Sequence, residues 1–163
     1  EKGGTAQQRV SFPMPPDSQI HLHFISSELA VRQSLTRLMT QLRKTRLCED
    51  DLGRVELMLA EVLNNVVEHA YGAGAYGPVD LTCDLFEDVL KLVVVDQGRD
   101  LPSDMFQPRE FADPTQMSDD LPEGGWGWTL IQSLAKTISY TRQEDVNVLT
   151  LTLDVDTPQA AIG

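Results

Sequence analysis

Residues 49–71 most constrain what this chain can fold into. Apolar residues recur there at steps of three and four, the spacing of an α-helix that buries one face. Glycines follow at positions 72 and 74, and glycine commonly closes a helix. The pattern predicts one helix from Glu49 to Tyr71, whose buried stripe consists of Leu52, Val55, Leu59, Val62, Val66 and Ala70.

Polar side chains flank this stripe. Glu61 and Asn65 are four residues apart, and an α-helix places them on one face. Glu68 and His69 lie seven and eight residues after Glu61, on the same expected face. Carboxylate and carboxamide oxygens suit hydrated Mg²⁺, and a carboxylate can polarise a nucleophile. Taken alone, the segment is equally typical of a solvated helix face with a histidine at the edge of the core.

Length and composition indicate one globular domain. The chain has 163 residues, of which 41% are hydrophobic. No apolar run approaches the roughly 20 residues that a membrane span needs, so we expect a soluble protein that does not bind membranes. Cys48 and Cys83 have neither metal-binding spacing nor the pattern of a disulfide framework, which fits a reducing, cytoplasmic compartment.

The charge is strongly acidic and uneven. Thirteen basic against 25 acidic residues give a net charge of −12, which argues against binding to a nucleic-acid backbone. Residues 103–124 contain six acids and one base, whereas residues 29–48 contain five bases and no acid. Such runs are typical of solvated surface, and the alternative is a face for a charged protein partner. The five bases are Arg32, Arg37, Arg43, Lys44 and Arg46.

Two further helices and five strands are expected. One helix, which Ser26 or Ser27 can cap, has an apolar stripe of Val31, Leu35, Leu38 and Leu42. The other starts at Gly127. The run Leu92–Val95 is typical of a central strand buried on both faces. The expected strands are residues 20–24, 79–86, 89–96, 137–142 and 148–155, with turns at 87–88 and 144–145.

This order predicts an α+β fold, a two-layer α/β sandwich with helices on one face of a mixed, mostly antiparallel sheet. The folded domain is expected to span residues 19–156. Residues 1–18 and 157–163 are expected to be a flexible lead-in and a flexible tail. Residues 100–124 contain prolines and little apolar periodicity, and we expect them to form a mobile lid.

Two glycine motifs follow the long helix. In Asp96-Gln97-Gly98 the aspartate ends a buried strand, where it can accept a hydrogen bond from a base edge, and Gly98 allows close backbone approach to a flat ring. Gly125 and Gly127 precede an amphipathic helix, whose free N–H groups suit a phosphate. Each motif alone is weak, because an ordinary strand-ending turn or helix start has similar residues.

In this order the three motifs resemble the N, G1 and G2 boxes of the GHKL ATPase superfamily, which includes gyrase, chaperone, histidine-kinase and mismatch-repair members. Within it the chain is similar to the small anti-sigma-factor serine/threonine kinases, which share the pattern Glu-x-x-x-Asn-x-x-x-His-Ala-Tyr found at residues 61–71. The resemblance covers residues 20–155 and implies the Bergerat ATP-binding fold.

The resemblance implies ATP and Mg²⁺ as ligands and gives individual residues a role. Asn65 would ligate Mg²⁺, and Glu61 would be the base that activates the attacking hydroxyl. Gly125 and Gly127 would cradle the phosphates, with Thr129 near them.

Three further residues complete this assignment. Asp96 would bind the adenine amino group, with Gly98 beside it. His69 matches a position near the nucleotide pocket, and its alternative is a packed or surface histidine.

The implied function is phosphorylation of an anti-anti-sigma-like (STAS) protein and regulation by partner switching. A sigma factor as second partner and a homodimer are left open, and the start at Glu1 leaves open a larger multidomain regulator. The alternative is a non-catalytic, nucleotide-sensing module that sequesters a sigma factor or antagonist. Three differences from the family pattern favour this alternative, namely Asp100, Glu123 and Asn147. A plain α+β domain without nucleotide is the third interpretation, and it requires all three motifs to be coincidental.

Overall fold

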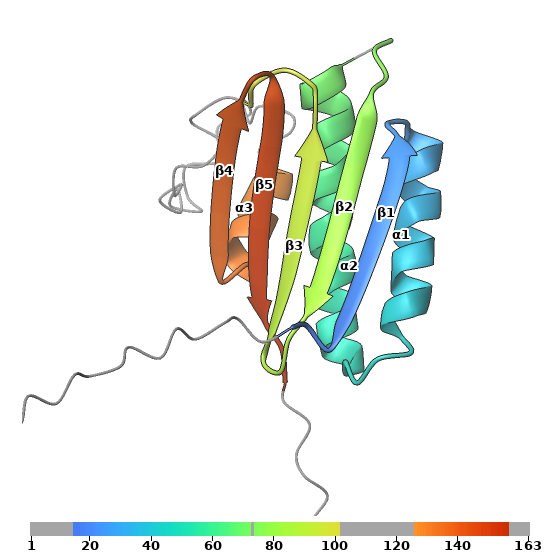
Figure 1. Ribbon diagram of the computed structural model, residues 1–163, viewed down its shortest axis with the longest axis vertical. Coiled ribbons are helices and arrows are strands. Elements are labelled where there is room, and N and C mark those ends of the chain that lie inside the picture. The colour runs from blue at the N-terminus through green and yellow to red at the C-terminus, as the bar shows by residue number, and fades with distance from the viewer. Residues whose placement is uncertain (1–14, 73, 102–125, 157–163) are drawn as a thin grey trace, which may run out of the picture.

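The computed structural model describes residues 15–72, 74–101 and 126–156. Five strands form one sheet in the order β1-β2-β3-β5-β4, and every pairing is antiparallel. The helices lie together behind this sheet, so the described residues cover only one of its faces (Figure 1). The elements are β1 (Ser18–Ile25), α1 (Glu28–Leu42), α2 (Glu49–Asn65), η1 (Val66–Tyr71), β2 (Pro78–Leu85), β3 (Val89–Asp96), α3 (Trp126–Leu134), β4 (Thr137–Gln143) and β5 (Val146–Asp154).

The predicted α+β two-layer sandwich is therefore confirmed. Two hairpins join β2 to β3 and β4 to β5, with turns at the expected places. In the second turn Glu144 and Asp145 both have positive φ, at 50° and 62°, which suits a tight two-residue hairpin turn. Ser27 is the N-cap of α1, because its hydroxyl accepts a hydrogen bond from the Ala30 N–H at 3.1 Å.

The core lies between the sheet and the helices. All six residues of the predicted α2 stripe are buried, and Val55 and Leu59 have no exposed surface. In β2, β3 and β5 every second side chain points into this core. Burial of these alternating side chains fixes the strand register, because a slip by one residue would expose the whole set.

One prediction for the sheet is wrong. The run Leu92–Val95 lies in a central strand, as expected, but β3 is fully buried on one face only. Val93 and Val95 are half-buried, because all helices of the described chain lie on the opposite face. The valine-rich run therefore reflects the preference of β-branched residues for strands as much as burial.

Some expectations fall outside the described ranges. These are most of the lead-in, the tail from residue 157 and the lid from residue 102 onward. Within the described ranges no helix has the length and apolar character needed to cross a membrane.

Candidate functional site

The long helix changes type where the polar motif begins. The predicted helix reaches Tyr71, but α2 ends at Asn65 and the chain continues as the π-helix η1. The Gly72 N–H donates to the Val67 carbonyl at 3.1 Å, five residues back. π-turns inside helices are rare and frequently occur at functional sites.

This π-turn corrects the predicted shared face. A π-helix has more residues per turn than an α-helix, so residues after Asn65 rotate away from the expected line. Asn65 is buried, with 8% of its surface exposed, whereas the side chains of Glu68 and His69 are 68% and 38% exposed. Glu61 is intermediate. Glu61 and Asn65 therefore remain one α-helical turn apart, while Glu68 and His69 form a separate exposed pair 4.0 Å apart.

The end of η1 meets the loop that follows β3. The Arg99 N–H donates to the Ala70 carbonyl at 2.6 Å. A Cβ atom at Gly98 would lie 2.4 Å from the same carbonyl oxygen, so only glycine permits this approach. The Tyr71 hydroxyl accepts from the Gln97 N–H at 2.8 Å and donates to the Pro78 carbonyl at 2.6 Å. The first two predicted motifs are thus joined by direct backbone and side-chain contacts.

Asp96 is a buried acid at the end of β3, with 4% of its surface exposed. Its Oδ1 accepts hydrogen bonds from the Gly98 N–H at 2.9 Å and from Asn147 Nδ2 at 2.8 Å. Burial raises the pKa of this carboxyl, while these two hydrogen bonds and the charge of Arg142 oppose the rise. In the part of the chain that the structure describes, no hydrogen bond ends on Oδ2, which leaves this oxygen for a ligand.

Asn147 lies directly opposite Asp96 in the sheet and organises the loop after β3. Its Nδ2 also donates to the Arg99 carbonyl at 2.9 Å. Its Oδ1 accepts from Tyr140 at 2.8 Å and from Arg142 at 2.7 Å. Asn147, noted in the sequence only as a departure from the family pattern, is therefore the hub that orients the buried carboxylate.

Tyr140 and Arg142 are site residues that the sequence analysis missed. The Tyr140 hydroxyl contacts Asp100 Oδ1 at 2.9 Å and accepts from the Leu101 N–H at 3.1 Å. Arg142 Nη1 donates to the Gly98 carbonyl at 2.8 Å. Both lie on the edge strand β4, where no sequence motif marks them. Leu101 is buried and Asp100 is exposed, and both of these first two residues of the expected lid are hydrogen-bonded to Tyr140 of β4.

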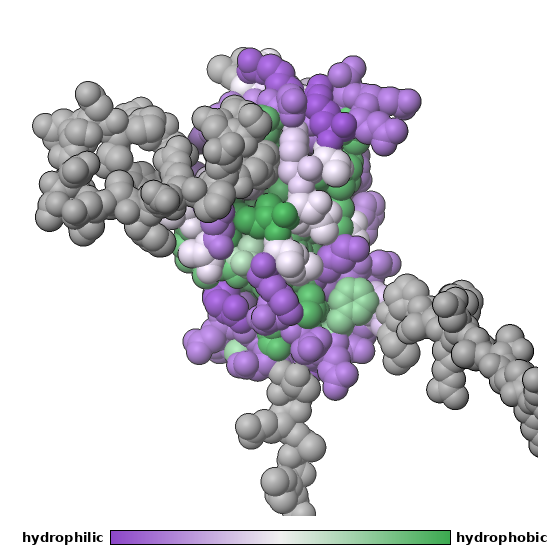
Figure 2. Space-filling model, turned by 90° about the vertical axis from the view of Figure 1, so that its left-hand side faces the viewer, coloured by the Kyte–Doolittle hydropathy of each residue, from purple (hydrophilic) through white to green (hydrophobic). Residues whose placement is uncertain are grey.

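α3 packs beside α2 and carries part of the second glycine motif. Gly127 lies in the first turn of α3, and Thr129 follows, half-buried and engaged with neighbouring groups. Gly125 lies outside the described residues. A cavity of about 210 Å³ lies between α3 and β4, lined by Trp128, Gln132, Ile138 and Tyr140. Seen from this side, hydrophobic residues occupy the middle of the surface and hydrophilic residues gather at its upper and lower ends (Figure 2).

The residues present fit a metal-bound nucleotide. Asn65 Nδ2 is buried and has no hydrogen-bond partner among the described residues, so its carboxamide is available to a ligand. The amide oxygen and nitrogen of an asparagine exchange places by a simple flip, so the same group can present an oxygen to Mg²⁺. Glu61 forms no hydrogen bond or ion pair with any described residue and lies one helical turn before Asn65.

This fold, with the α2–η1 motif joined to the Asp96–Gly98 loop, defines a GHKL-type domain. Residues 26–153 match the histidine kinase-like ATPase domain, and the chain belongs to that family. The predicted family is thereby confirmed, together with its two-layer fold.

Several curated relatives are named serine-protein kinase RsbW. That of Halalkalibacterium halodurans is 36% identical over 107 residues, covering 63% of this chain and 62% of the relative. That of Bacillus subtilis is 29% identical over 101 residues, covering 61% and 62%. This chain therefore spans about 62% of the length of these relatives.

A solved structure agrees with the fold. The crystal structure of the RsbU and RsbW domains of a Mycobacterium tuberculosis protein aligns with a TM-score of 0.61 and 17% identity, covering 88% of this chain and 34% of that one.

Proposed function

We propose that this protein is an ATP-binding serine/threonine protein kinase of the anti-sigma-factor type. The observation that carries the proposal is the Ala70–Gly98 contact, which brings the Glu61–Asn65 motif and the buried Asp96 to one end of the sheet. A buried carboxylate with one free oxygen suits the adenine amino group, and a buried, unpaired carboxamide suits Mg²⁺. The curated relatives named as serine-protein kinases support the same reaction.

In the proposed reaction Mg²⁺–ATP is the phosphoryl donor, and Mg²⁺ neutralises phosphate charge. Asn65 holds the metal. Glu61 would accept the proton of the attacking serine or threonine hydroxyl as the hydroxyl oxygen bonds to the γ-phosphorus. The bond from the γ-phosphorus to the bridging oxygen breaks, and ADP leaves. The α3 start, with Gly127 and Thr129, contacts the phosphates, and Gly125 has the same expected role.

The proposed partner is an anti-anti-sigma-like (STAS) protein, with a sigma factor as the competing partner in a partner switch. The exposed bases of α1 and the turn after it give a cationic surface for an acidic face of such a partner. They are Arg32, Arg37, Arg43 and Lys44. Arg46 does not belong to this surface, because its guanidinium donates to the Phe86, Glu87 and Asp156 carbonyls.

The test is phosphate transfer from labelled ATP to the cognate partner, with Glu61→Gln and Asn65→Ala as matched variants. Glu61→Gln keeps the shape of the side chain but removes the base, so transfer should fall by about 10²–10⁴-fold while ATP binding is retained. Asn65→Ala should weaken Mg²⁺-dependent binding and transfer together.

Each outcome separates two interpretations. If the wild-type protein transfers no phosphate, the kinase interpretation is contradicted, and the non-catalytic, nucleotide-sensing module becomes the better interpretation. That alternative is favoured by Asn147, which already occupies Asp96 Oδ1 where the family pattern has a Gly-Thr pair. If the Glu61→Gln variant still transfers phosphate at the wild-type rate, the protein is a kinase but Glu61 is not its catalytic base.

A further inference from the structure

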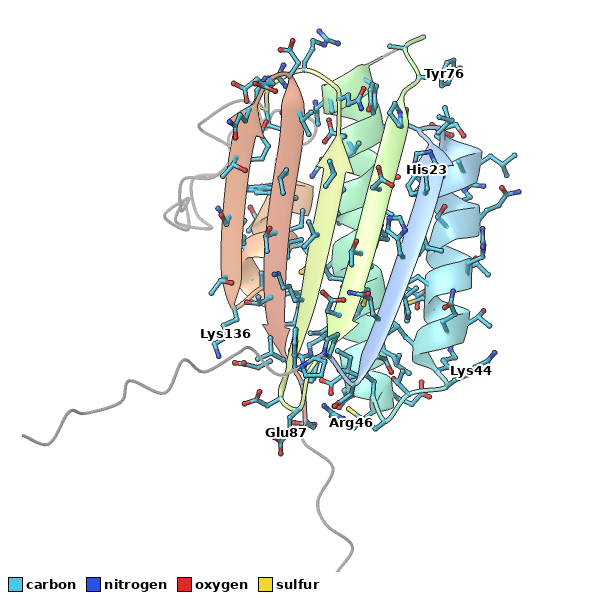
Figure 3. All side chains as sticks on the ribbon, in the orientation of Figure 1. His23, Lys44, Arg46, Tyr76, Glu87 and Lys136 are labelled. Atoms are coloured by element: carbon cyan, nitrogen blue, oxygen red, sulfur yellow. The ribbon has the colours of Figure 1, made fainter. Side chains whose placement is uncertain are left out.

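Two histidines lie on the sheet face that the helices leave uncovered. His21 and His23 are two residues apart in β1, so their side chains emerge on the same side of the sheet. Figure 3 shows His23 on this strand at the edge of the sheet. The two side chains are 59% and 56% exposed. Neither belongs to the core or to the proposed nucleotide site, which lies on the helix-covered face.

Asp80 of β2 brings both imidazoles to one oxygen atom. It is the cross-strand neighbour of His23. Its Oδ1 lies 2.9 Å from His23 Nδ1 and 3.3 Å from His21 Nε2, and its side chain is 41% exposed. A single carboxylate oxygen is thus shared by two rings from the neighbouring strand.

These distances match two edges of a metal coordination polyhedron. With metal–ligand distances of about 2.0–2.1 Å, neighbouring ligand atoms in a tetrahedral site are roughly 3.3 Å apart. The third edge, between the two imidazoles, is not closed, because among the described residues only Cys48, Asp51 and Asp156 have donor atoms that all lie within 4.8 Å of one another. Closing it requires the exposed histidine side chains to rotate about their own bonds. The backbone positions are fixed by the β1–β2 ladder and need not move.

We propose that His21, His23 and Asp80 form a binding site for a divalent transition metal ion, with Zn²⁺ as the best match. Two imidazoles and one carboxylate are a donor set used by zinc, and three protein ligands leave a fourth position open to solvent. Nitrogen donors select zinc, nickel or copper over Mg²⁺, so this site does not compete for the metal of the nucleotide. The net charge of −12 further favours a bound cation.

The ion would join β1, at the edge of the described sheet, to its neighbour β2. Binding to the folded state alone stabilises that state in proportion to metal concentration. The site therefore predicts a metal-dependent rise in melting temperature that is independent of nucleotide.

A second group of donors must be distinguished from this one. Cys48, Asp51 and Asp156 also lie close enough to share an ion. However, Asp51 is buried and already accepts hydrogen bonds from Arg54 and from the Asp156 N–H. The Asp51 N–H donates to the Cys48 thiol and lowers its pKa, but desolvation and the charges of Asp51 and Asp156 outweigh this and raise the pKa, and a protonated thiol is a poor ligand.

The experiment titrates the full chain, without any histidine tag, with Zn²⁺ in a calorimeter and with Co²⁺ by absorption spectroscopy. We expect one equivalent of Zn²⁺ to bind, a visible Co²⁺ spectrum, and a rise in melting temperature that a chelator reverses. The variants His21→Ala, His23→Ala and Asp80→Asn should each lose the Zn²⁺ binding, the Co²⁺ spectrum and the metal-dependent rise in melting temperature. Gln19→Ala, on the same strand face, and His69→Ala, which removes the third histidine, should retain it.

The two histidine side chains are more than half exposed and that of Asp80 is 41% exposed, so the variants should melt close to the wild-type temperature without metal, which separates lost binding from lost folding. No stoichiometric binding by the wild-type chain would overturn the proposal. Binding that survives His23→Ala but disappears in Cys48→Ala would overturn it as well, in favour of the thiol cluster.

Discussion

At the scale of single residues, Asp96 is a buried carboxyl that destabilises the fold when it is ionised and that is proposed to bind adenine. Its burial raises the pKa of the carboxyl above the ordinary value of 3.8. The folded state therefore holds the proton more tightly than the unfolded chain does. This carboxyl favours folding at acid pH, and its contribution is lost as pH rises from the unfolded pKa through the raised folded pKa. Above the raised pKa the folded protein carries a buried charge.

Asp96→Asn tests this residue directly. An asparagine oxygen can still accept from Gly98 and Asn147, and the buried charge is gone. We expect the melting temperature without nucleotide to be equal or higher near neutral pH, with the difference vanishing in acid. ATP binding should weaken by roughly 1–3 kcal/mol, because a charge-assisted hydrogen bond to adenine is lost. Calorimetry and melts across pH measure both effects, and unchanged ATP affinity would remove Asp96 from the adenine role.

At the scale of elements, the contact between η1 and the loop after β3 assembles the site. The sequence predicts the helix, the strand and the glycine separately, because each follows from local spacing and residue type. It does not predict that Gly98 packs on Ala70, since this contact joins segments 28 residues apart. The π-turn was also missed, because apolar spacing of three and four continues through it.

Two glycine substitutions with opposite expected signs test this contact. Gly98→Ala would place Cβ 2.4 Å from the Ala70 carbonyl oxygen and 2.6 Å from its Cβ, so the backbone must shift. We expect a loss of roughly 1–3 kcal/mol in unfolding free energy together with weaker ATP binding. Gly53→Ala, in an exposed position of α2 with nothing within 4 Å, should instead gain about 0.5–1 kcal/mol.

Denaturant unfolding measures both variants. A Gly98→Ala variant as stable as the wild-type chain would show that the close approach does not require glycine. Gly53→Ala is the control, because it adds the same methyl group at a glycine where nothing lies within 4 Å. A loss of stability in Gly98→Ala alone therefore reports the contact with Ala70.

At the scale of the whole molecule, the sequence predicts the architecture better than the site. Alternation and helical spacing give the two layers, because burial on one face fixes both patterns. The polar network of Asn147, Tyr140 and Arg142 escapes the sequence, since β4 and β5 meet Asp96 only after the sheet has formed. The partial exposure of Val93 and Val95 escapes it too, because a valine-rich run suggests burial on both faces even though helices are predicted on only one.

Binding of Mg²⁺–ATP should stabilise the whole domain, because the ligand joins α2, β3 and α3 in the folded state only. At a ligand concentration 100 times the dissociation constant the gain is about 2.7 kcal/mol. For a chain of this size that corresponds to a rise in melting temperature of roughly 5–10 °C. Differential scanning fluorimetry with Mg²⁺ alone, with ATP and Mg²⁺, and with GTP and Mg²⁺ measures the effect.

GTP is the informative control, because guanine has a carbonyl where adenine has its amino group. That carbonyl oxygen would face the Asp96 carboxylate, and two acceptors repel each other at hydrogen-bond distance. We therefore expect ATP to raise the melting temperature and GTP to leave it nearly unchanged. Equal shifts with both nucleotides would agree with phosphate contacts at α3 but would exclude Asp96 as the residue that recognises the base. No shift with either nucleotide, at concentrations where calorimetry also detects no heat, would contradict nucleotide binding and with it the proposed kinase.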